Sequence, residues 1–482
     1  MKKIGKMMNM AVSSILAASM LMGCGDEVIS TAAQNIEEKE QPVAGEENVT
    51  KAEPQKENEE KPSANTSSED KTTVINTAAN IATEKSDSGK EDQKQEQEQE
   101  QEQKDIDVSG DFDKALMKFV ENSGFAGENY MVSPISFRAA LALAVAGADT
   151  ETKDELIRAM GFETMDEVNA WYASVTQIIT DFDIYMDEEK KIFDQQKQWM
   201  DKDAKSPEGA LIMMNSVWNN TDLNGKFAKD YIKYVNKNYN AEAYDVTSNK
   251  FTEKANKWVS DGTNGLIPTI SNDLSQVNAV LINTLYLKSS WVNAFEKYAT
   301  AQDTFTTVNG DKVQKEFMNQ EDHFRFYEDA NGKLVVLPLN GGVDAVFVLG
   351  EIEDVQDALS KASREDVIVK LPKFEVESAF AENEFIDFLQ KRGAGLAFTD
   401  YADFSVMCPD TSWMISDIIQ KTKIKVDEDG LEAAAATAVM MLESALMIED
   451  EPKKFIADEP FKFYIFAGED SSEMLFCGQV VK

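Results

Sequence analysis

The chain has 482 residues and is strongly acidic, with 48 Lys and Arg against 87 Asp and Glu and a formal net charge of −39. This balance argues against nucleic acid as a partner, because neutralising phosphates requires clustered Lys and Arg. His323 is the single histidine of the chain, which disfavours a Ser-His-Asp protease and a multi-histidine metal site. The three cysteines, Cys24, Cys408 and Cys477, are too few for a disulfide-dense secreted scaffold. We therefore expect neither a metal nor a cofactor.

Residues 1–23 have the pattern of a secretory signal, with three early lysines followed by an uncharged, mostly apolar run over 7–22. This run is too short for a membrane span, which takes about 20 residues. It ends in 21–24 (LMGC), which resembles the lipobox of bacterial lipoproteins. That resemblance implies a lipidated Cys24 and a protein held on the outer side of the bacterial membrane, at the cell surface or in a periplasm. The alternative is an ordinary secretory signal with a chance cysteine.

The next segment, 24–110, has the composition of a disordered acidic tether. Pro, Glu, Gln, Lys, Ser, Thr and Asn dominate over 25–110, aromatic residues are absent, and 95–103 alternate Gln and Glu. Such a segment buries too little apolar surface to offset the entropy lost on ordering. We expect a solvated spacer between the membrane and the rest of the chain.

The composition becomes globular over 111–482, and the expected elements are mixed. Apolar periodicity predicts helices at 111–121, 134–146 and 151–160, the second of them almost wholly apolar and therefore buried. Runs rich in Val, Leu, Ile and Phe predict strands at 277–287, 333–339, 345–349, 367–371, 461–466 and 474–481. Helices concentrate early and strands late, which favours an α+β fold over alternating βαβ units.

Several segments of this body, taken in order, resemble motifs of the serpin family. They are 129–136 (NYMVSPIS), 215–218 (NSVW), 257–259 (KWV) with 263–265 (TNG), 280–288 (VLINTLYLK) with Trp291 and Phe295, 425–438 (KVDEDGLEAAAATA), and 460–463 (PFKF) with 476–481 (FCGQVV). The resemblance implies a large central sheet, flanking helices and an exposed reactive loop at about 428–459. Most members of the family inhibit serine or cysteine proteases with a single-use trap. The target forms an acyl-enzyme with the loop, and the cleaved loop inserts into the sheet as a new strand.

The resemblance also implies a hinge at the start of the loop, made of Glu428, Gly430, Leu431, Glu432, Ala433, Ala434, Ala435 and Ala436. Helix propensity alone would predict a helix over 431–443. As an inserted strand, the alternate residues from 431 to 441 would share one buried face and are nearly all apolar. That pattern ends at Glu443. We therefore expect the hinge to be able to insert.

Two positions depart from the family pattern. Leu431 stands where inhibitory serpins commonly have Thr or Ser, and its bulk would slow insertion and favour simple cleavage. Gln420 stands where many members have a histidine beneath the sheet opening, and its amide can donate and accept without titrating. Ser136 and Asn283 match the other members of that group, which we call the shutter, and Trp291 matches a tryptophan near the point where the loop enters the sheet. The alternative roles are a helix cap for Ser136, a satisfied core amide for Asn283 and core packing for Trp291.

Family spacing counted from Gly430 places the scissile bond after Ser444, and counting back from 460–461 places it several residues later. The reactive-site window is therefore Ser444, Ala445, Leu446 and Met447. No Lys or Arg lies between 425 and 453, so trypsin-like proteases are poor targets. Apolar residues suit elastase-like, subtilisin-like or chymotrypsin-like enzymes, while Glu443 leaves a Glu-preferring protease as an alternative.

The leading hypothesis is a monomeric, cell-surface serpin that inhibits such serine proteases. The alternative is a non-inhibitory serpin that acts as a surface binding or structural protein. An enzyme is the weakest hypothesis, because no nucleophile has a histidine partner in the sequence. We expect His323 on the surface, Cys408 and Cys477 as buried thiols in strands, and the acidic runs as solvated faces.

Overall fold

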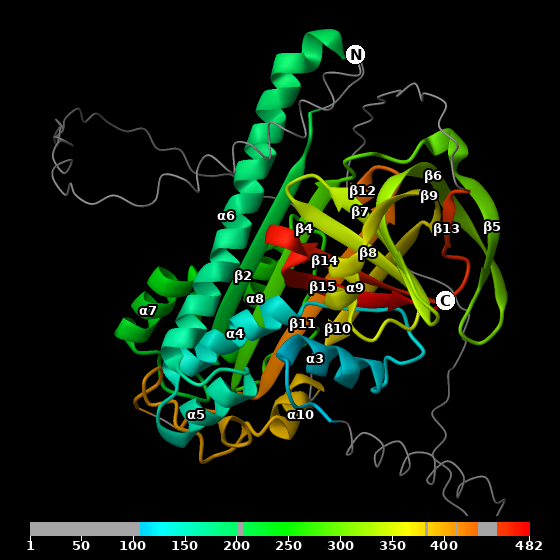
Figure 1. The fold of residues 1–482 in the computed structure, drawn as a ribbon. Coiled ribbons are helices and arrows are strands. Elements are labelled where there is room, and N and C mark those ends of the chain that lie inside the picture. Colours follow the sequence, from blue (N-terminus) through cyan, green and yellow to red (C-terminus); the bar gives the residue numbers. More distant parts are fainter. Residues whose placement is uncertain (1–106, 201–205, 381–383, 411, 432–450) are drawn as a thin grey trace, which may run out of the picture. The chain divides into compact units, whose positions relative to one another are not determined.

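The computed structural model describes residues 107–200, 206–380, 384–410, 412–431 and 451–482. The described helices are α3 (Phe112–Glu121), α4 (Pro134–Gly147), α5 (Thr150–Ala159), α6 (Met165–Gln196), α7 (Lys229–Tyr239), α8 (Ser248–Gly262), α9 (Val355–Lys361) and α10 (Glu384–Lys391) (Figure 1). Short 3-10 turns occur at Lys197–Trp199, Lys297–Ala299, Leu396–Phe398 and Glu469–Ser471. Within the described ranges, no helix is both long enough and apolar enough to cross a membrane.

The strands form two sheets. They are β1 (Tyr130–Val132), β2 (Gly209–Asn220), β3 (Glu242–Val246), β4 (Ala279–Ser290), β5 (Ala301–Thr306), β6 (Lys312–Glu328), β7 (Gly332–Leu339), β8 (Val343–Gly350), β9 (Ser363–Pro372), β10 (Phe374–Phe380), β11 (Asp417–Asp427), β12 (Gly430–Leu431), β13 (Lys453–Ile456), β14 (Phe461–Ala467) and β15 (Glu473–Val480). The nine-stranded sheet has the order β1-β15-β14-β8-β7-β6-β9-β13, with β5 paired to β6, and the six-stranded sheet has the order β10-β11-β12-β4-β2-β3. Helices and two largely antiparallel sheets confirm the predicted α+β class.

Helix α4 is the centre of the fold because it is apolar on every side. All but one of its residues are buried, and it packs against both β4 and β15. The Ser133 hydroxyl accepts a hydrogen bond from the backbone N–H of Ser136, and Pro134 occupies the first helical position, where its missing N–H costs nothing. This N-cap confirms the start predicted for the helix at 134.

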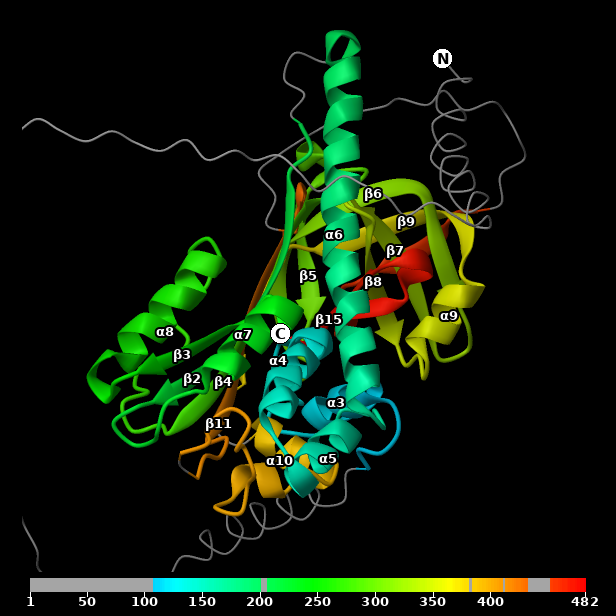
Figure 2. The same cartoon turned by 90° about the vertical axis from the view of Figure 1, so that its left-hand side faces the viewer.

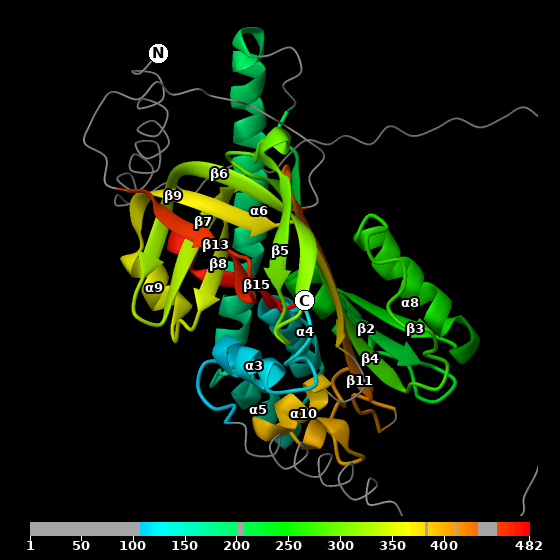
Figure 3. The same ribbon diagram turned by 90° about the vertical axis from the view of Figure 1, so that its right-hand side faces the viewer.

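The six-stranded sheet lies between α8 on one face and α4 and α6 on the other (Figures 2 and 3). Val280 and Ile282 of β4 pack with Phe251 of α8, while Leu285 and Leu287 pack in the core that contains the apolar face of α6. Alternate residues of β4 therefore serve two different cores, as the pleat of a strand requires. This two-sided burial explains why apolar residues predominate in 277–287 without alternating with polar ones.

The predicted helices and strands are each present with small shifts of their ends, but we predicted no helix over 165–196. There the structure has α6, the longest described helix, with the Thr164 hydroxyl accepting from the N–H of Glu167 at its start. Its buried residues recur at helical spacing and are Val168, Tyr172, Val175, Ile178, Phe182, Met186 and Phe193. That spacing is visible in the sequence and could have predicted the helix.

The two described cysteines are buried and not joined to each other. Cys477 lies in β15, as expected, but Cys408 lies in the loop between α10 and β11. The prediction that both thiols lie in strands was therefore wrong for Cys408. Its Sγ lies 3.5 Å from the carbonyl oxygen of Lys226. His323 has an exposed side chain, as expected, and its Nε2 lies 2.9 Å from Asp366.

Candidate functional site

The six-stranded sheet contains an opening between its two central strands. β4 and β11 run parallel and are paired directly only where 280–283 meet 417–420. Beyond that point, 284–288 and 421–425 have no described strand on their facing edges. Strand edges with free N–H and C=O groups readily accept an added strand. Here such edges lie in the middle of a sheet, which is unusual.

The far end of the opening is closed by β12. Gly430 pairs with Ser290 of β4 and with Asp427 of β11, and Leu431 pairs with Ser289 and Val426. A Cβ on Gly430 would lie 2.3 Å from the carbonyl oxygen of Ser289, and the residue has φ +143°. Only glycine tolerates that conformation at such close backbone contact.

Leu431 is already part of the sheet. Its side chain is 1% exposed and lies in the same apolar core as Ile424 and Val426 of β11 and Leu287 of β4. Of the predicted hinge residues that the structure describes, Gly430 and Leu431 therefore already lie between β4 and β11. In the native sheet the bulk of the leucine is therefore accommodated by this core.

The segment 291–300 crosses over the residues that precede β12. The indole N–H of Trp291 donates to the carbonyl oxygen of Asp427 over 2.9 Å, and the backbone N–H groups of Trp291 and Phe295 donate to the carbonyls of Asp429 and Glu428. Trp291 is 3% exposed. These three hydrogen bonds fix the turn from which β12 and the loop start.

The acidic run at this turn is buried, which corrects the expectation that the acidic runs are solvated faces. Asp427, Glu428 and Asp429 are 9%, 6% and 7% exposed. Each has a lysine partner: Lys425 lies 3.0 Å from Asp427, Lys373 lies 3.3 Å from Glu428, and Lys297 lies 2.9 Å from Asp429. Buried carboxylates persist when such partners and hydrogen bonds replace water.

Glu428 shows the balance of these forces. Burial by itself raises the pKa of this carboxyl, but hydrogen bonds from its own backbone N–H, from the Thr300 hydroxyl over 2.9 Å and from Lys373 bring the pKa below its usual value. The hydrogen bond to Asp429 is the main cause of the raised pKa of Lys297. Glu428 therefore remains ionised and ties this turn to Lys373, which lies between β9 and β10.

The opposite end of the opening is closed by the shutter. The Gln420 side chain accepts from the N–H of Ser133 over 2.9 Å, and its Nε2 lies 2.9 Å from both Ser136 Oγ and Asn283 Oδ1 and 3.0 Å from the Ser133 carbonyl oxygen. The Ser136 hydroxyl also donates to Asn283 Oδ1 over 2.9 Å. All four residues are fully buried. The structure thus brings Ser136, Asn283 and Gln420 into one hydrogen-bonded group at the β4–β11 pair that borders the opening.

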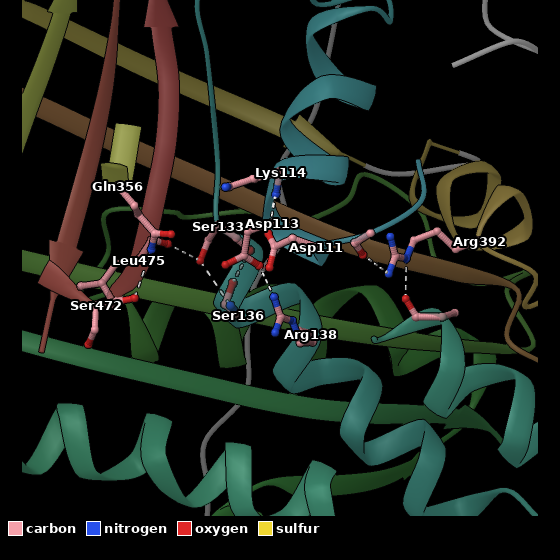
Figure 4. A network of polar contacts seen from close by, with 12 residues as sticks. Asp111, Asp113, Lys114, Ser133, Ser136, Arg138, Gln356, Arg392, Ser472 and Leu475 are labelled. Carbon is pink, nitrogen blue, oxygen red and sulfur yellow. Dashed lines mark hydrogen bonds and ion pairs between the residues drawn. The ribbon is translucent and has the colours of Figure 1, made fainter. Parts of the chain in front are cut away.

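Ser133, which we did not single out from the sequence, links this group to the nine-stranded sheet. Its hydroxyl donates to the carbonyl oxygen of Leu475 in β15 over 2.7 Å (Figure 4). Lys297, Thr300 and Lys373 were also missed. Their signal in the sequence is weak, because an isolated Lys or Thr in a strand or turn is usually exposed.

Several predicted residues lie outside the described ranges. These are Cys24, Glu432, Ala433, Ala434, Ala435, Ala436, Glu443, Ser444, Ala445, Leu446 and Met447, together with 1–23 and most of the tether. Of the predicted hinge, the structure describes Glu428, Gly430 and Leu431, and all three are bonded to or paired with residues of the segment 289–295.

Comparisons with known proteins agree on one family. Residues 108–482 match the family model Serpin (serine protease inhibitor). An uncharacterized serpin-like protein of Thermococcus kodakarensis is 30% identical over 374 residues, which cover 73% of this chain and 80% of the relative. Leukocyte elastase inhibitor A of Mus musculus is 26% identical over 381 residues, which cover 73% of this chain and 92% of the relative.

Solved structures agree with these relatives. The thermophilic serpin tengpin in its native state aligns with a TM-score of 0.62 and 27% identity, covering 79% of this chain and 94% of tengpin. Human thyroxine-binding globulin complexed with thyroxine aligns with a TM-score of 0.63 and 22% identity, covering 78% of this chain and 97% of the globulin. At that identity the second likeness bears on the fold alone.

Proposed function

The chain belongs to the serpin family, and from this premise we propose that it traps serine proteases with its own reactive loop. Its fold is the predicted serpin fold. Membership supports serine protease inhibition as the general function, and inhibitors rather than catalysts are what the family name describes. The finer proposal is a suicide substrate that is acylated within Ser444, Ala445, Leu446 and Met447 and then inserts its loop between β4 and β11.

The observation that carries this proposal is the opening with free edges between 284–288 and 421–425. A strand added there would gain backbone hydrogen bonds on both sides, which is a large driving force that the native sheet leaves unused. β12 already occupies the first two positions of such a strand. Insertion of the hinge can therefore continue from a strand that has already started.

The two registers of β12 agree on where an inserted strand would run. Continued antiparallel along β4 from the Leu431–Ser289 pair, the chain would set Thr437 opposite Asn283, and continued along β11 from the Leu431–Val426 pair it would set Thr437 opposite Gln420. Insertion past Thr437 therefore has to separate Asn283 from Gln420. The same register places Glu443 beyond the start of both strands, so its charge need not be buried.

The proposed targets are proteases with apolar pockets. The loop has no Lys or Arg between 425 and 453, and the reactive-site window is small and apolar except for its first residue. Acidic residues at 449–451 would favour targets with a basic surface around the active site.

The test incubates the mature chain carrying Cys24→Ser with elastase, chymotrypsin, subtilisin and trypsin. We expect a covalent, denaturant-resistant complex with at least one of the first three, and none with a protease whose catalytic serine is replaced by alanine. The mass of the released C-terminal fragment identifies the cleaved bond. Cleavage without any complex would favour a non-inhibitory binding protein, and a complex with trypsin alone would contradict the proposed window.

We further propose that the protein is monomeric and lipid-anchored through Cys24 on the outer side of the membrane, with 25–110 as a spacer. The support is the 21–24 motif and the composition of the tether. The mature chain is expected to partition into the detergent phase of a two-phase extraction, whereas the Cys24→Ala chain should remain in the aqueous phase. Equal partition of the two chains would contradict the anchor.

A further inference from the structure

Helix α6 extends past the level at which β12 enters the sheet. Gly209 pairs with Ser289, the partner of Leu431, and a Cβ on Gly209 would lie 2.9 Å from the Met186 sulfur. The residues of α6 after Met186 therefore continue beyond the end of β2, and Figures 1 and 2 show these last turns projecting past the strands. Glu189 lies on this part of α6, just beyond the end of β2.

Where α6 passes the end of β2, it packs on the turn 340–342 between β7 and β8, which we call the β7–β8 turn. Gly341 and Gly342 have φ of +82° and +72°, and an added Cβ would lie 2.3 Å from the Phe182 ring and 3.1 Å from the Tyr185 ring. The turn therefore lies directly on α6 with no room for a side chain. One turn further along the helix, Glu189 Oε1 accepts from the N–H of Gly341 over 3.3 Å.

The Glu189 carboxyl is poorly compensated at this place. Its Oε2 is buried and has no hydrogen-bond partner among the described residues. Burial raises the pKa of Glu189 to about 7, and the Gly341 N–H offsets this only in part. The carboxyl thus changes charge near neutral pH while in contact with the turn.

The β7–β8 turn is in turn bonded to the residues that hold β12. The Ser289 hydroxyl donates to the Asn340 carbonyl over 2.7 Å, Asn340 Nδ2 lies 2.7 Å from Ser290 Oγ, and the Asn340 N–H donates to the Ser290 carbonyl over 2.9 Å. Ser289 and Ser290 are the β4 partners of Leu431 and Gly430. A continuous set of contacts therefore joins Glu189 to Ser289 and Ser290 at the C-terminal end of β4.

We propose that Glu189 is a proton-controlled latch. In its neutral form it holds α6 on the β7–β8 turn, and when ionised it releases the C-terminal end of β4 for loop insertion. β4 and β2 must move relative to β11 when a strand is added between them. The β7–β8 turn belongs to the other sheet, so it restrains that movement. Ionisation strengthens the hydrogen bond from Gly341 but adds the larger cost of a buried charge, which lowers the restraint. The effect on trapping rests on the proposed function.

The other charged groups near Glu189 do not account for a change of charge at this contact, so Glu189 is the group that titrates there. The β7–β8 turn has no titratable residue. Glu208 and Lys288 at the ends of β2 and β4 form an ion pair, but they alternate with Gly209 and Leu287 and so lie on the opposite face of the sheet from α6. On α6 itself, Glu188 is exposed, and Tyr185 packs on Gly342.

The sign of the effect follows from the raised pKa. Between the ordinary value of 4.5 and about 7, the latched state keeps a proton that the open state has lost, so opening becomes easier as pH rises through this window. Each pKa unit corresponds to about tenfold in the opening equilibrium. Above about pH 8 the effect levels off, because both states are ionised.

The test is hydrogen–deuterium exchange of the peptide that contains Gly341 and Gly342, corrected for intrinsic exchange, between pH 5 and 8. We expect opening to rise about tenfold or more in the full mature chain with Cys24→Ser and in its Glu188→Gln control, which changes the net charge equally. In Glu189→Gln, which keeps the acceptor for the Gly341 N–H but cannot ionise, opening should stay level. The same pH dependence in Glu189→Gln, or none in the control, would overturn the latch.

A second measurement addresses the link to insertion with a protease that forms the covalent complex. At each pH, the molar excess of inhibitor needed for full inhibition is compared between Glu189→Gln and Glu188→Gln. We expect the excess needed with Glu189→Gln, divided by the excess needed with Glu188→Gln, to rise with pH. The reason is that ionisation of Glu189 releases the latch only in the Glu188→Gln chain. A constant ratio would overturn the link to insertion, whereas absence of any complex would reject the proposed function and leave the exchange result to decide on the latch.

Discussion

Replacing Leu431 with arginine is expected to convert the protein from a trap into a substrate of its target protease. The leucine side chain is 1% exposed inside the core shared by β4, β11 and α6. A guanidinium in that position would be buried without a counter-charge, at a cost of several kcal/mol. The hinge can avoid this cost by leaving the sheet for solvent, so the fold should survive while the inserted strand loses its first residue.

The measurement is the number of inhibitor molecules consumed per protease molecule trapped. This number is one plus the ratio of hydrolysis to trapping, and we expect that ratio to rise about tenfold or more, because a shift of about 1.4 kcal/mol between the two barriers changes it tenfold. Leu431→Thr is the matched control, since it carries the residue common in inhibitory serpins and should trap at least as efficiently as the natural chain. An unchanged yield of complex from Leu431→Arg would mean that the hinge does not insert at this position.

The central strand β4 could be predicted from the sequence because it is buried on both faces, whereas its neighbours β2 and β11 were not predicted. Val280 and Ile282 pack on α8 while Leu281 and Leu285 pack on the other side, so apolar residues face both ways along the strand and predominate in the run. The α4 helix is equally clear, because it is apolar all round and begins with a capping serine and a proline. Periodicity does not tell which strands pair. The resemblance predicted a large central sheet, and the order of its strands is known from the structure.

The burial of the acidic turn could not be predicted in the same way. A run of three carboxylates is usually solvated, and here it is buried because Lys297, Lys373 and Thr300 come to it from distant parts of the chain. Leu431 is a similar case. From the sequence, the size of Leu431 predicted slower insertion. Its position inside a formed core depends on the register of β12 with β4 and β11, which the sequence does not show. The reactive-site window remains a prediction.

Replacing Gln420 with leucine is expected to destabilise the native state by roughly 3 kcal/mol. The side chain now satisfies the N–H and carbonyl of Ser133 and reaches Ser136 and Asn283, all of them fully buried. Leucine fills a similar volume but bonds none of these groups, and each buried group left without a partner costs about 1–3 kcal/mol. Urea unfolding of the two chains measures the difference, with an unchanged m-value as evidence that both unfold from the same compact state.

Gln420→His is the control, because a neutral imidazole can accept from the Ser133 N–H through one nitrogen and donate through the other. Near pH 8 it should recover most of the stability lost in Gln420→Leu. Burial disfavours the charged imidazole, so its pKa should fall in the folded state, and the recovered stability should be lost as pH falls below about 6.5. The glutamine chain has no such group at this position and should show no matching loss. If Gln420→Leu were as stable as the natural chain, the hydrogen bonds of the shutter would be too weak to hold β4 and β11 together, and the barrier to insertion would have to lie at the β12 end of the opening.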